Sequence, residues 1–233
     1  MTSRLLSRAT LALVAVLLLA AECTAGDPGS LAPGSKPAGP DPGNCSGVAS
    51  LVRRVRRGWY LGRSPQLSFV AHEPHYVGRA SMPPHTGPWD FLMDVPVVMY
   101  GPGVIARRGR IGARATVADL APTTAALVRF DGWPTRDGRV LGEALARGAP
   151  PPRLVLTIVW DGAGDNLLEA HPKSWPYLRS LMRAGVSFEN AIIGSTPSNT
   201  PPIHATIGTG AWPRRHGIVS VTQRSDGEDI DPW

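Results

Sequence analysis

One apolar run, Leu154–Trp160, constrains the fold more than any other part of this 233-residue chain. Its residues are β-branched or otherwise apolar, and Thr157 is its one polar member. Such a run is typical of a strand buried on both faces, as in a parallel sheet covered by helices. The run ends at Asp161, and ligands bind at the carboxyl ends of strands in open α/β sheets. We therefore expect Asp161 at a ligand-binding edge. The competing interpretation is an aspartate that only starts a turn.

The residues after this run predict a β-α-β unit. Ser174 can cap a helix that Gly185 ends, and residues 186–193 predict the next strand. The helix has Leu178, Leu181 and Met182 on one face. The expected fold class is α/β, with a mostly parallel central sheet and helices on both faces.

A second anchor is Thr200, which directly precedes two prolines. We expect Thr200 at the N-cap of a helix, Pro201 at its first position and Gly210 at its end. A hydroxyl there lies beside free backbone N–H groups and the positive end of the helix, which favour a bound anion. Threonine is a poor nucleophile without a base or a metal, so an ordinary cap remains the alternative. His204 follows one turn later, and it is either a packed or solvated helix residue or a ligand.

Together these motifs resemble the alkaline phosphatase superfamily, closest to its nucleotide pyrophosphatase/phosphodiesterase branch. The resemblance rests on VLTIVWDGAGDN at 155–166 and NTPPIHATIGTGAWPRRHGI at 199–218. It implies that Asp161 is a zinc ligand and that Thr200 is both a metal ligand and the nucleophile that forms a covalent phospho-enzyme. One departure concerns Ile203, because that branch usually has an asparagine there that donates to a phosphate oxygen. This departure puts the substrate class in doubt.

An earlier stretch resembles the carboxyl-terminal end of the same superfamily. It includes PHTGPWDFLMDVPVVMYGPGV at 84–104 and extends to Ala146. By this match His85 is the ligand of the other zinc ion, although Thr86 interrupts the more usual His-Gly pairing. Local patterns predict a strand at Val95–Tyr100, a turn at 101–103, and a capping box formed by Thr116 and Asp119. They also predict a helix at Leu120–Val128 and a short closing turn or helix at 142–146.

The half that normally ends the fold therefore comes first, and circular permutation is our interpretation of this order. An unrelated fusion and a gene-model error are the competing explanations. The predicted organisation is a signal peptide at 1–25, a Pro/Gly-rich tether at 26–45, a C-terminal-like segment at 46–147, a Pro-rich joint at 148–153 and an N-terminal-like segment at 154–233.

The expected cofactors are two divalent metal ions, with zinc favoured by the resemblance. The ligand set is incomplete, because Asp161, Thr200 and His85 are the only ligands that the resemblance provides, whereas zinc normally takes three or four protein ligands. We find no further Asp-x-x-x-His or Asp-His pair in the sequence. His72 and His75 are spaced like possible nitrogen ligands, but solvated loop histidines are common.

The amino terminus predicts secretion or attachment to a cell envelope, in a bacterial setting. Arg4 and Arg8 precede an apolar run at 9–21 that is too short to span a bilayer comfortably, which is typical of a signal peptide. Cys23 is a possible lipidation site and would then attach the chain to a membrane.

Composition agrees with these expectations but discriminates little. The formal net charge is +6, and one dense cluster consists of Arg53, Arg54, Arg56 and Arg57. The cluster could attract phosphates or anionic lipid, or it could be a solvated basic segment beside the tether. No basic motif interleaved with aromatic residues predicts a nucleic-acid module. The expected substrate is a small phosphate ester, and the alternative is a non-catalytic or inactive fragment of the superfamily.

Overall fold

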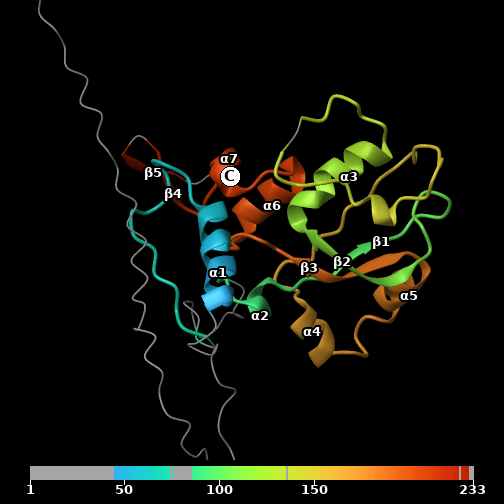
Figure 1. The fold of residues 1–233 in the computed structure, drawn as a ribbon, viewed down its shortest axis with the longest axis horizontal. Coiled ribbons are helices and arrows are strands. Elements are labelled where there is room, and N and C mark those ends of the chain that lie inside the picture. Colours follow the sequence, from blue (N-terminus) through green and yellow to red (C-terminus); the bar gives the residue numbers. More distant parts are fainter. Residues whose placement is uncertain (1–44, 74, 76–85, 135, 226, 231–233) are drawn as a thin grey trace, which may run out of the picture.

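The computed structural model describes residues 45–73, 75, 86–134, 136–225 and 227–230 (Figure 1). His85, Cys23, the signal peptide and nearly all of the predicted tether lie outside the described residues. In chain order the elements are α1 (Cys45–Gly58), α2 (Asp90–Met93), β1 (Val97–Met99), β2 (Gly109–Thr116), η1 (Val117–Asp119), α3 (Leu120–Leu127), η2 (Gly142–Ala144), α4 (Asp165–Ala170), α5 (Pro176–Ala184), β3 (Val186–Ile192), α6 (Thr200–Thr209), α7 (Pro213–His216), β4 (Gln223–Ser225) and β5 (Glu228–Ile230).

The main sheet has the strand order β1-β3-β2 and is mixed. Strand β2 pairs parallel to β3, whereas β1 pairs antiparallel to β3 through Val97–Phe188, Val98–Ser187 and Met99–Val186. A second sheet consists of the β4–β5 hairpin. The α/β class is therefore confirmed, but a mostly parallel central sheet is not found among the described residues.

The predicted strand Leu154–Trp160 is wrong in this structure. These residues form no helix or strand and lie at the surface, with Leu154, Leu156 and Ile158 exposed to 80%, 75% and 70%. A strand needs a neighbour to satisfy its backbone groups, and no strand of the described residues lies in pairing position. The apolar pattern correctly indicates a segment suited to burial, but no described strand pairs with it.

The helix and strand that follow are close to expectation. Helix α5 begins at Pro176 with Trp175 as its N-cap, one residue later than a cap at Ser174 predicts, since proline is favoured in a first turn. It ends at Gly185, where a Cβ would lie 2.1 Å from the Met99 carbonyl oxygen. Glycine is thus required for the close approach of this turn to β1. Strand β3 follows as predicted, while the short helix α4 was not foreseen.

The predicted elements of the earlier half are also present. Strand β1 is shorter than the range Val95–Tyr100, and the turn after it closes with the Ile105 N–H donating to Gly101 O at 2.8 Å. The capping box predicted at Thr116 and Asp119 is confirmed at the start of η1. Helix α3 and the closing turn η2 lie within their predicted ranges.

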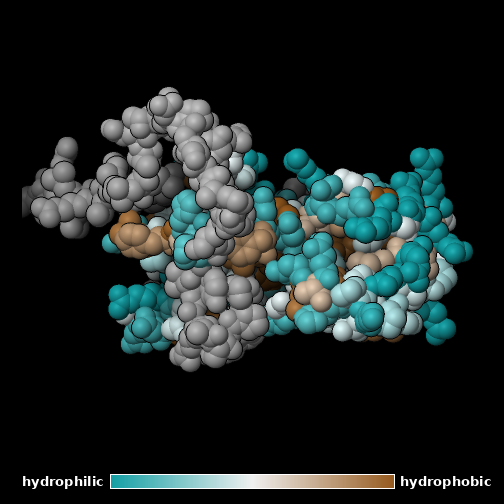
Figure 2. Space-filling view, turned by 90° about the horizontal axis from the view of Figure 1, so that it is seen from below, coloured by the Kyte–Doolittle hydropathy of each residue, from teal (hydrophilic) through white to brown (hydrophobic). Residues whose placement is uncertain are grey.

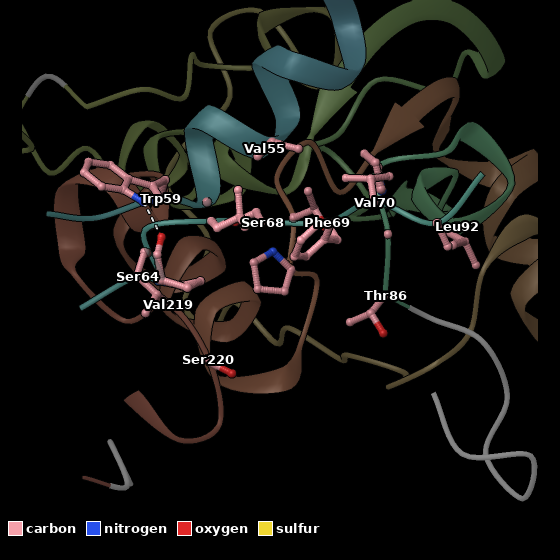
Figure 3. A pocket seen from close by; sticks show the side chains of 18 of the residues that line it. Val55, Trp59, Ser64, Ser68, Phe69, Val70, Thr86, Leu92, Val219 and Ser220 are labelled. Carbon is pink, nitrogen blue, oxygen red and sulfur yellow. Dashed lines mark hydrogen bonds between the residues drawn. The ribbon is translucent and has the colours of Figure 1, made fainter. Parts of the chain in front are cut away.

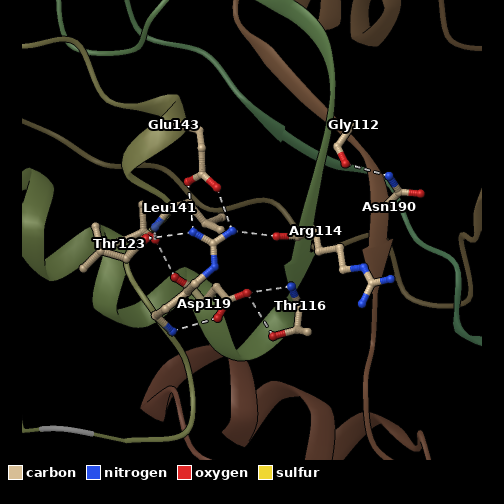
Figure 4. Close-up of polar contacts among 10 residues, drawn as sticks. Gly112, Arg114, Thr116, Asp119, Thr123, Leu141, Glu143 and Asn190 are labelled. Atoms are coloured by element: carbon tan, nitrogen blue, oxygen red, sulfur yellow. Dashed lines mark hydrogen bonds and ion pairs between the residues drawn. The ribbon is translucent and has the colours of Figure 1, made fainter. Parts of the chain in front are cut away.

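Asp119 is a buried carboxylate that joins several backbone segments (Figure 4). It accepts hydrogen bonds from the Thr116 N–H at 2.7 Å and from the Arg139 N–H at 2.8 Å. Its own carbonyl oxygen accepts from Thr123 Oγ1, which in turn accepts from the Leu141 N–H at 2.9 Å. Because a buried carboxylate is costly without such partners, this network fixes the loop 129–141 to α3.

The hydrophobic core lies between the main sheet and the segments on either side of it. It includes residues from both sequence halves, so neither half forms this core by itself. Its buried members are Val97, Ile105, Ala115, Leu141, Ala144, Val186, Phe188 and Ala191.

The arginine cluster is not the fully solvated basic segment that one interpretation of the sequence expected. It lies on α1, and its members are not all solvated: Arg54 is buried and donates to the Pro88 carbonyl and to Asp90 Oδ1. Arg57 donates to the Gly194 carbonyl at 3.1 Å and stacks over Trp212, 4.6 Å from the ring centroid. Two of the four arginines therefore attach α1 to the rest of the molecule, while Arg53 and Arg56 remain exposed.

Hydrophilic residues cover most of the part of the molecule on the right of Figure 2. No helix in the described residues has the length and apolar character needed to cross a membrane.

Candidate active site

Asp161 and Thr200, which are 39 positions apart, lie side by side. Thr200 Oγ1 donates a hydrogen bond to Asp161 Oδ2 at 2.9 Å. Asp161 is exposed at the end of the irregular segment Leu154–Trp160, and Thr200 is partly exposed at the start of α6. A hydroxyl with a carboxylate within hydrogen-bond reach is the arrangement required of a nucleophile and its proton acceptor.

The start of α6 differs by one residue from the prediction. Asn199 occupies the N-cap and Thr200 is the first helical residue, while Gly210 ends the helix with a φ of 66° as expected. Pro201 and Pro202 lack N–H groups, and the Ile203 N–H already donates to Asn199 O at 3.2 Å. Of the donors expected at this helix end, the Thr200 N–H remains without a partner among the described residues. The anion-binding capacity of this end is accordingly small.

His204 lies one turn after Thr200 and contacts its backbone. Its Nδ1 is 2.9 Å from the Thr200 carbonyl oxygen, which can only accept, so Nδ1 carries the proton. This contact supports the first turn of α6, which carries the Thr200 hydroxyl.

Both residues border a groove of about 820 Å³. One side is formed by residues 154–164 and the other by β1 with the segment before it, while α5 and α6 provide apolar side chains. The lining is mainly apolar, with Asp94, Asp161, Asn166, Asn199 and Thr200 among its polar members. A small ester could reach the Thr200 hydroxyl from this groove.

Sequence reasoning missed the carboxylates of Asp94 and Asp165. The Asp165 N–H donates to the Asp94 carbonyl oxygen at 3.2 Å, which brings α4 to the edge of the groove. Burial, followed by repulsion from Asp90, raises the pKa of Asp94. Burial, followed by repulsion from Asp94 and Glu169, raises the pKa of Asp165. Their positions next to predicted turns gave no signal that they would meet.

Asp161 and Thr200 supply two oxygen donors, which suit one edge of a divalent-metal site. Within the described ranges there is no group of three or more His, Cys, Asp or Glu residues that could hold a metal ion. Two donors fall short of the three or four that zinc takes, so the described residues do not complete a site. The proposed ligand His85 lies outside them.

His72 and His75 are not part of this groove. His75 lines a different cavity, of about 550 Å³, beside α1 (Figure 3). Its Nδ1 lies 3.2 Å from the His72 carbonyl oxygen, and His72 Nδ1 lies 2.7 Å from the Glu73 carbonyl oxygen. Both rings are thus held by local backbone contacts, and a ligand role for them stays untested.

Comparison with known proteins places the carboxyl-terminal part of the chain. Residues 155–232 match the family model described as type I phosphodiesterase / nucleotide pyrophosphatase. The matched span contains both Asp161 and Thr200, and the matched family is the branch of the alkaline phosphatase superfamily that the sequence motifs resemble.

The chain is also similar to a protein of Escherichia coli (strain K12) named as the uncharacterized sulfatase YdeN. The two are 43% identical over 63 residues, which are 27% of this chain and 11% of the relative. The chain thus spans a small part of the length of that relative. No solved structure matches the chain significantly.

Proposed function

We propose that this chain carries the nucleophile side of a hydrolase that acts on small phosphate or sulfate esters. The hydrogen bond from Thr200 Oγ1 to Asp161 Oδ2 carries the proposal, since it joins the two residues that the motifs single out. The family of residues 155–232 supports phosphate diesters as substrates, and the sulfatase relative supports sulfate esters.

In the proposed reaction, Thr200 Oγ1 attacks the phosphorus or sulfur atom and the bond to the departing ester oxygen breaks. Asp161 accepts the threonine proton along the existing hydrogen bond and returns it to the departing oxygen. Water then hydrolyses the phospho- or sulfo-threonine. In this proposal the Thr200 N–H, for which no partner is found among the described residues, donates to an ester oxygen, and the buried side chain of Ile203 offers no polar donor there.

Divalent metal ions held by Asp161 and Thr200, with His85 proposed for a second ion, would supply Lewis acidity that favours the threonine alkoxide. A carboxylate alone is a weak base for a threonine hydroxyl, because its ordinary pKa is about 4. For this reason the proposed chemistry depends on ligands beyond those of the described residues.

A covalent-labelling experiment tests the nucleophile. The purified chain is incubated with zinc and an aryl phosphate diester, an aryl phosphate monoester or an aryl sulfate, then quenched in acid and mapped by mass spectrometry. The expected result is a phosphoryl or sulfuryl group on Thr200 in the wild type and in Thr200→Ser, and none in Thr200→Ala. Thr209→Ala, in the same helix, is the matched control and should label like the wild type. Labelling that persists in Thr200→Ala, or no label with any ester, contradicts the proposal.

The second candidate is a non-catalytic member of the family. It is favoured by the absence of a three-ligand cluster among the described residues and by the apolar Ile203 beside the nucleophile position. Calorimetric titration with zinc distinguishes the two candidates. For a non-catalytic chain, the wild type and Asp161→Ala should have the same affinity for zinc, whereas for the hydrolase the variant should bind zinc more weakly.

The leader-like amino terminus supports secretion or envelope attachment as part of this proposal. Membrane fractionation of the wild type and Cys23→Ser tests it: a lipid anchor predicts release of the variant into the soluble fraction.

A further inference from the structure

The segment Leu154–Trp160 has the composition of a strand but pairs with no strand of the described residues. Leu154, Leu156 and Ile158 are 70–80% exposed, and the intervening Val155 is partly buried. Among the described residues, no backbone N–H or C=O group from Leu154 to Val159 makes a hydrogen bond. A row of free backbone groups next to apolar side chains is a template for pairing with another strand.

The sequence of this segment is complementary to itself when it is reversed about Thr157. When two copies pair antiparallel about that residue, apolar residues face apolar residues, Thr157 faces Thr157, and each charged residue faces one of opposite charge. The facing pairs are Arg153 with Asp161, Leu154 with Trp160, Val155 with Val159, Leu156 with Ile158, and Thr157 with Thr157.

We propose that Leu154–Trp160 pairs antiparallel with the same segment of a second copy of this chain, with the two-fold axis at Thr157. The pairing satisfies the free backbone groups of both copies. One face of the ribbon combines the four large apolar residues of each copy. The other face carries the valine pairs, a central threonine pair and an ion pair at each end. Cross-strand pairs of these kinds stabilise antiparallel sheets.

The charges select a second copy as the occupant and also fix the register. Arg153 and Asp161 are both exposed, so each can meet its counterpart across the axis. Two-fold symmetry forms the Arg153–Asp161 contact twice. A slip by one residue would move every side chain to the opposite face, and a slip by two would separate both ion pairs. An unrelated apolar peptide has no such charges at matching positions.

The adjoining groove leaves room for the partner strand. It lies between residues 154–164 and the segment Val95–Val98, and its apolar lining can receive large side chains of the partner's ribbon face. Asp161 also belongs to the candidate active site, so pairing and ester binding compete for one carboxylate. Dimerisation is measured without turnover, so its failure is distinguishable from failure of the proposed hydrolase activity.

Charge reversal tests the register by sedimentation equilibrium of the full chain. The wild type should show a concentration-dependent monomer–dimer equilibrium. Arg153→Asp and Asp161→Arg should each weaken it ~10-fold or more, because like charges then face each other at both ends. An equimolar mixture of the two variants should form a heterodimer, since the acidic ends of one variant face the basic ends of the other. Arg147→Asp, an exposed reversal outside the segment, is the control and should dimerise like the wild type.

A cysteine at the two-fold axis tests the geometry. In a background with Cys23→Ser and Cys45→Ser, Thr157→Cys faces itself and should form an intermolecular disulfide on mild oxidation. Leu154→Cys, equally exposed but six residues from its symmetry mate along the ribbon, should cross-link far less. A monomeric wild type overturns the proposal. A dimer that is unaffected by both charge reversals, or that cross-links equally through both cysteines, also overturns it.

Discussion

His216 lies half-buried between α6 and α7, where both ring nitrogens have partners. Nδ1 accepts from the Ile218 N–H at 3.1 Å, and Nε2 donates to Thr206 Oγ1 at 3.1 Å. Burial lowers the pKa of His216 to about 4, and it outweighs the opposite effects of the Pro202 carbonyl and Asp137. The fold therefore holds this imidazole in its neutral form.

This arrangement predicts a loss of stability in mild acid. The unfolded chain takes up a proton near pH 6.5 and the folded chain only near pH 4, so the free energy of unfolding falls as the pH drops below 6.5. We expect a melting temperature about 2–8 °C lower at pH 5 than at pH 7. His216→Asn, whose Oδ1 can still accept from Ile218, should show a smaller difference. Equal slopes in a calorimetric scan of the two proteins would contradict this.

Single residues differed in how well the sequence predicted them. The capping box at Thr116 was legible because its partners lie three residues apart. The pairing of Asp161 with Thr200 was expected only through the family motifs. Asp137 gave no local signal, because its partners Trp212 and Arg214 lie more than seventy residues away.

At the level of elements, arginine head groups attach α1 to the rest of the molecule. The Arg54 side chain is 10% exposed and satisfies the Pro88 carbonyl together with Asp90. Its own carbonyl oxygen accepts from the Thr196 N–H at 3.2 Å. Helix α1 is therefore attached to both sequence halves through this one residue.

Arg54→Met tests that attachment, because methionine keeps an apolar stem but leaves the Pro88 carbonyl without its donor. We expect a loss of about 1–3 kcal/mol in the free energy of unfolding. Arg56→Met removes an exposed arginine of the same helix and should change stability by less than about 0.5 kcal/mol. Urea denaturation of both variants measures the difference. Similar effects of the two changes would show that Arg54 is not an anchor.

Helices and turns were predicted better than strands. Gly210 ends α6 in a left-handed backbone conformation that favours glycine, and Gly185 ends α5 where the Met99 carbonyl oxygen leaves no room for a Cβ. A strand also depends on a neighbour, which local sequence does not specify. This is why 186–193 predicted β3 correctly while Leu154–Trp160 did not form a strand.

For the whole molecule, Asp137 joins the two sequence halves. Its side chain is 5% exposed, accepts from the Trp212 N–H at 3.0 Å and forms ion pairs with Arg214 and Arg215. Burial alone would raise the pKa of Asp137, but the Trp212 N–H and Arg214 together lower it. The carboxylate thus stays ionised and holds the loop before η2 against α7.

Asp137→Asn should therefore weaken the contact between the halves, since it leaves the two arginines without their counter-charge. We expect a loss of about 1–3 kcal/mol at pH 7 that shrinks as the pH falls through the lowered pKa of the wild-type carboxyl. Asp131→Asn, at an exposed position of the same loop, is the control. Guanidinium denaturation at pH 7 and at pH 3 gives the comparison, and a pH-independent difference would count against an ionic contact.

The exposed run Leu154–Trp160 has a consequence for the chain in solution. Six-residue windows of high β-propensity without charge or proline promote cross-β aggregation when they are exposed. Arg153 and Asp161 flank this window as gatekeepers, because stacking identical copies in parallel places like charges next to each other. Neutralising these two charges should shorten the lag before fibrils form, as read by thioflavin T fluorescence.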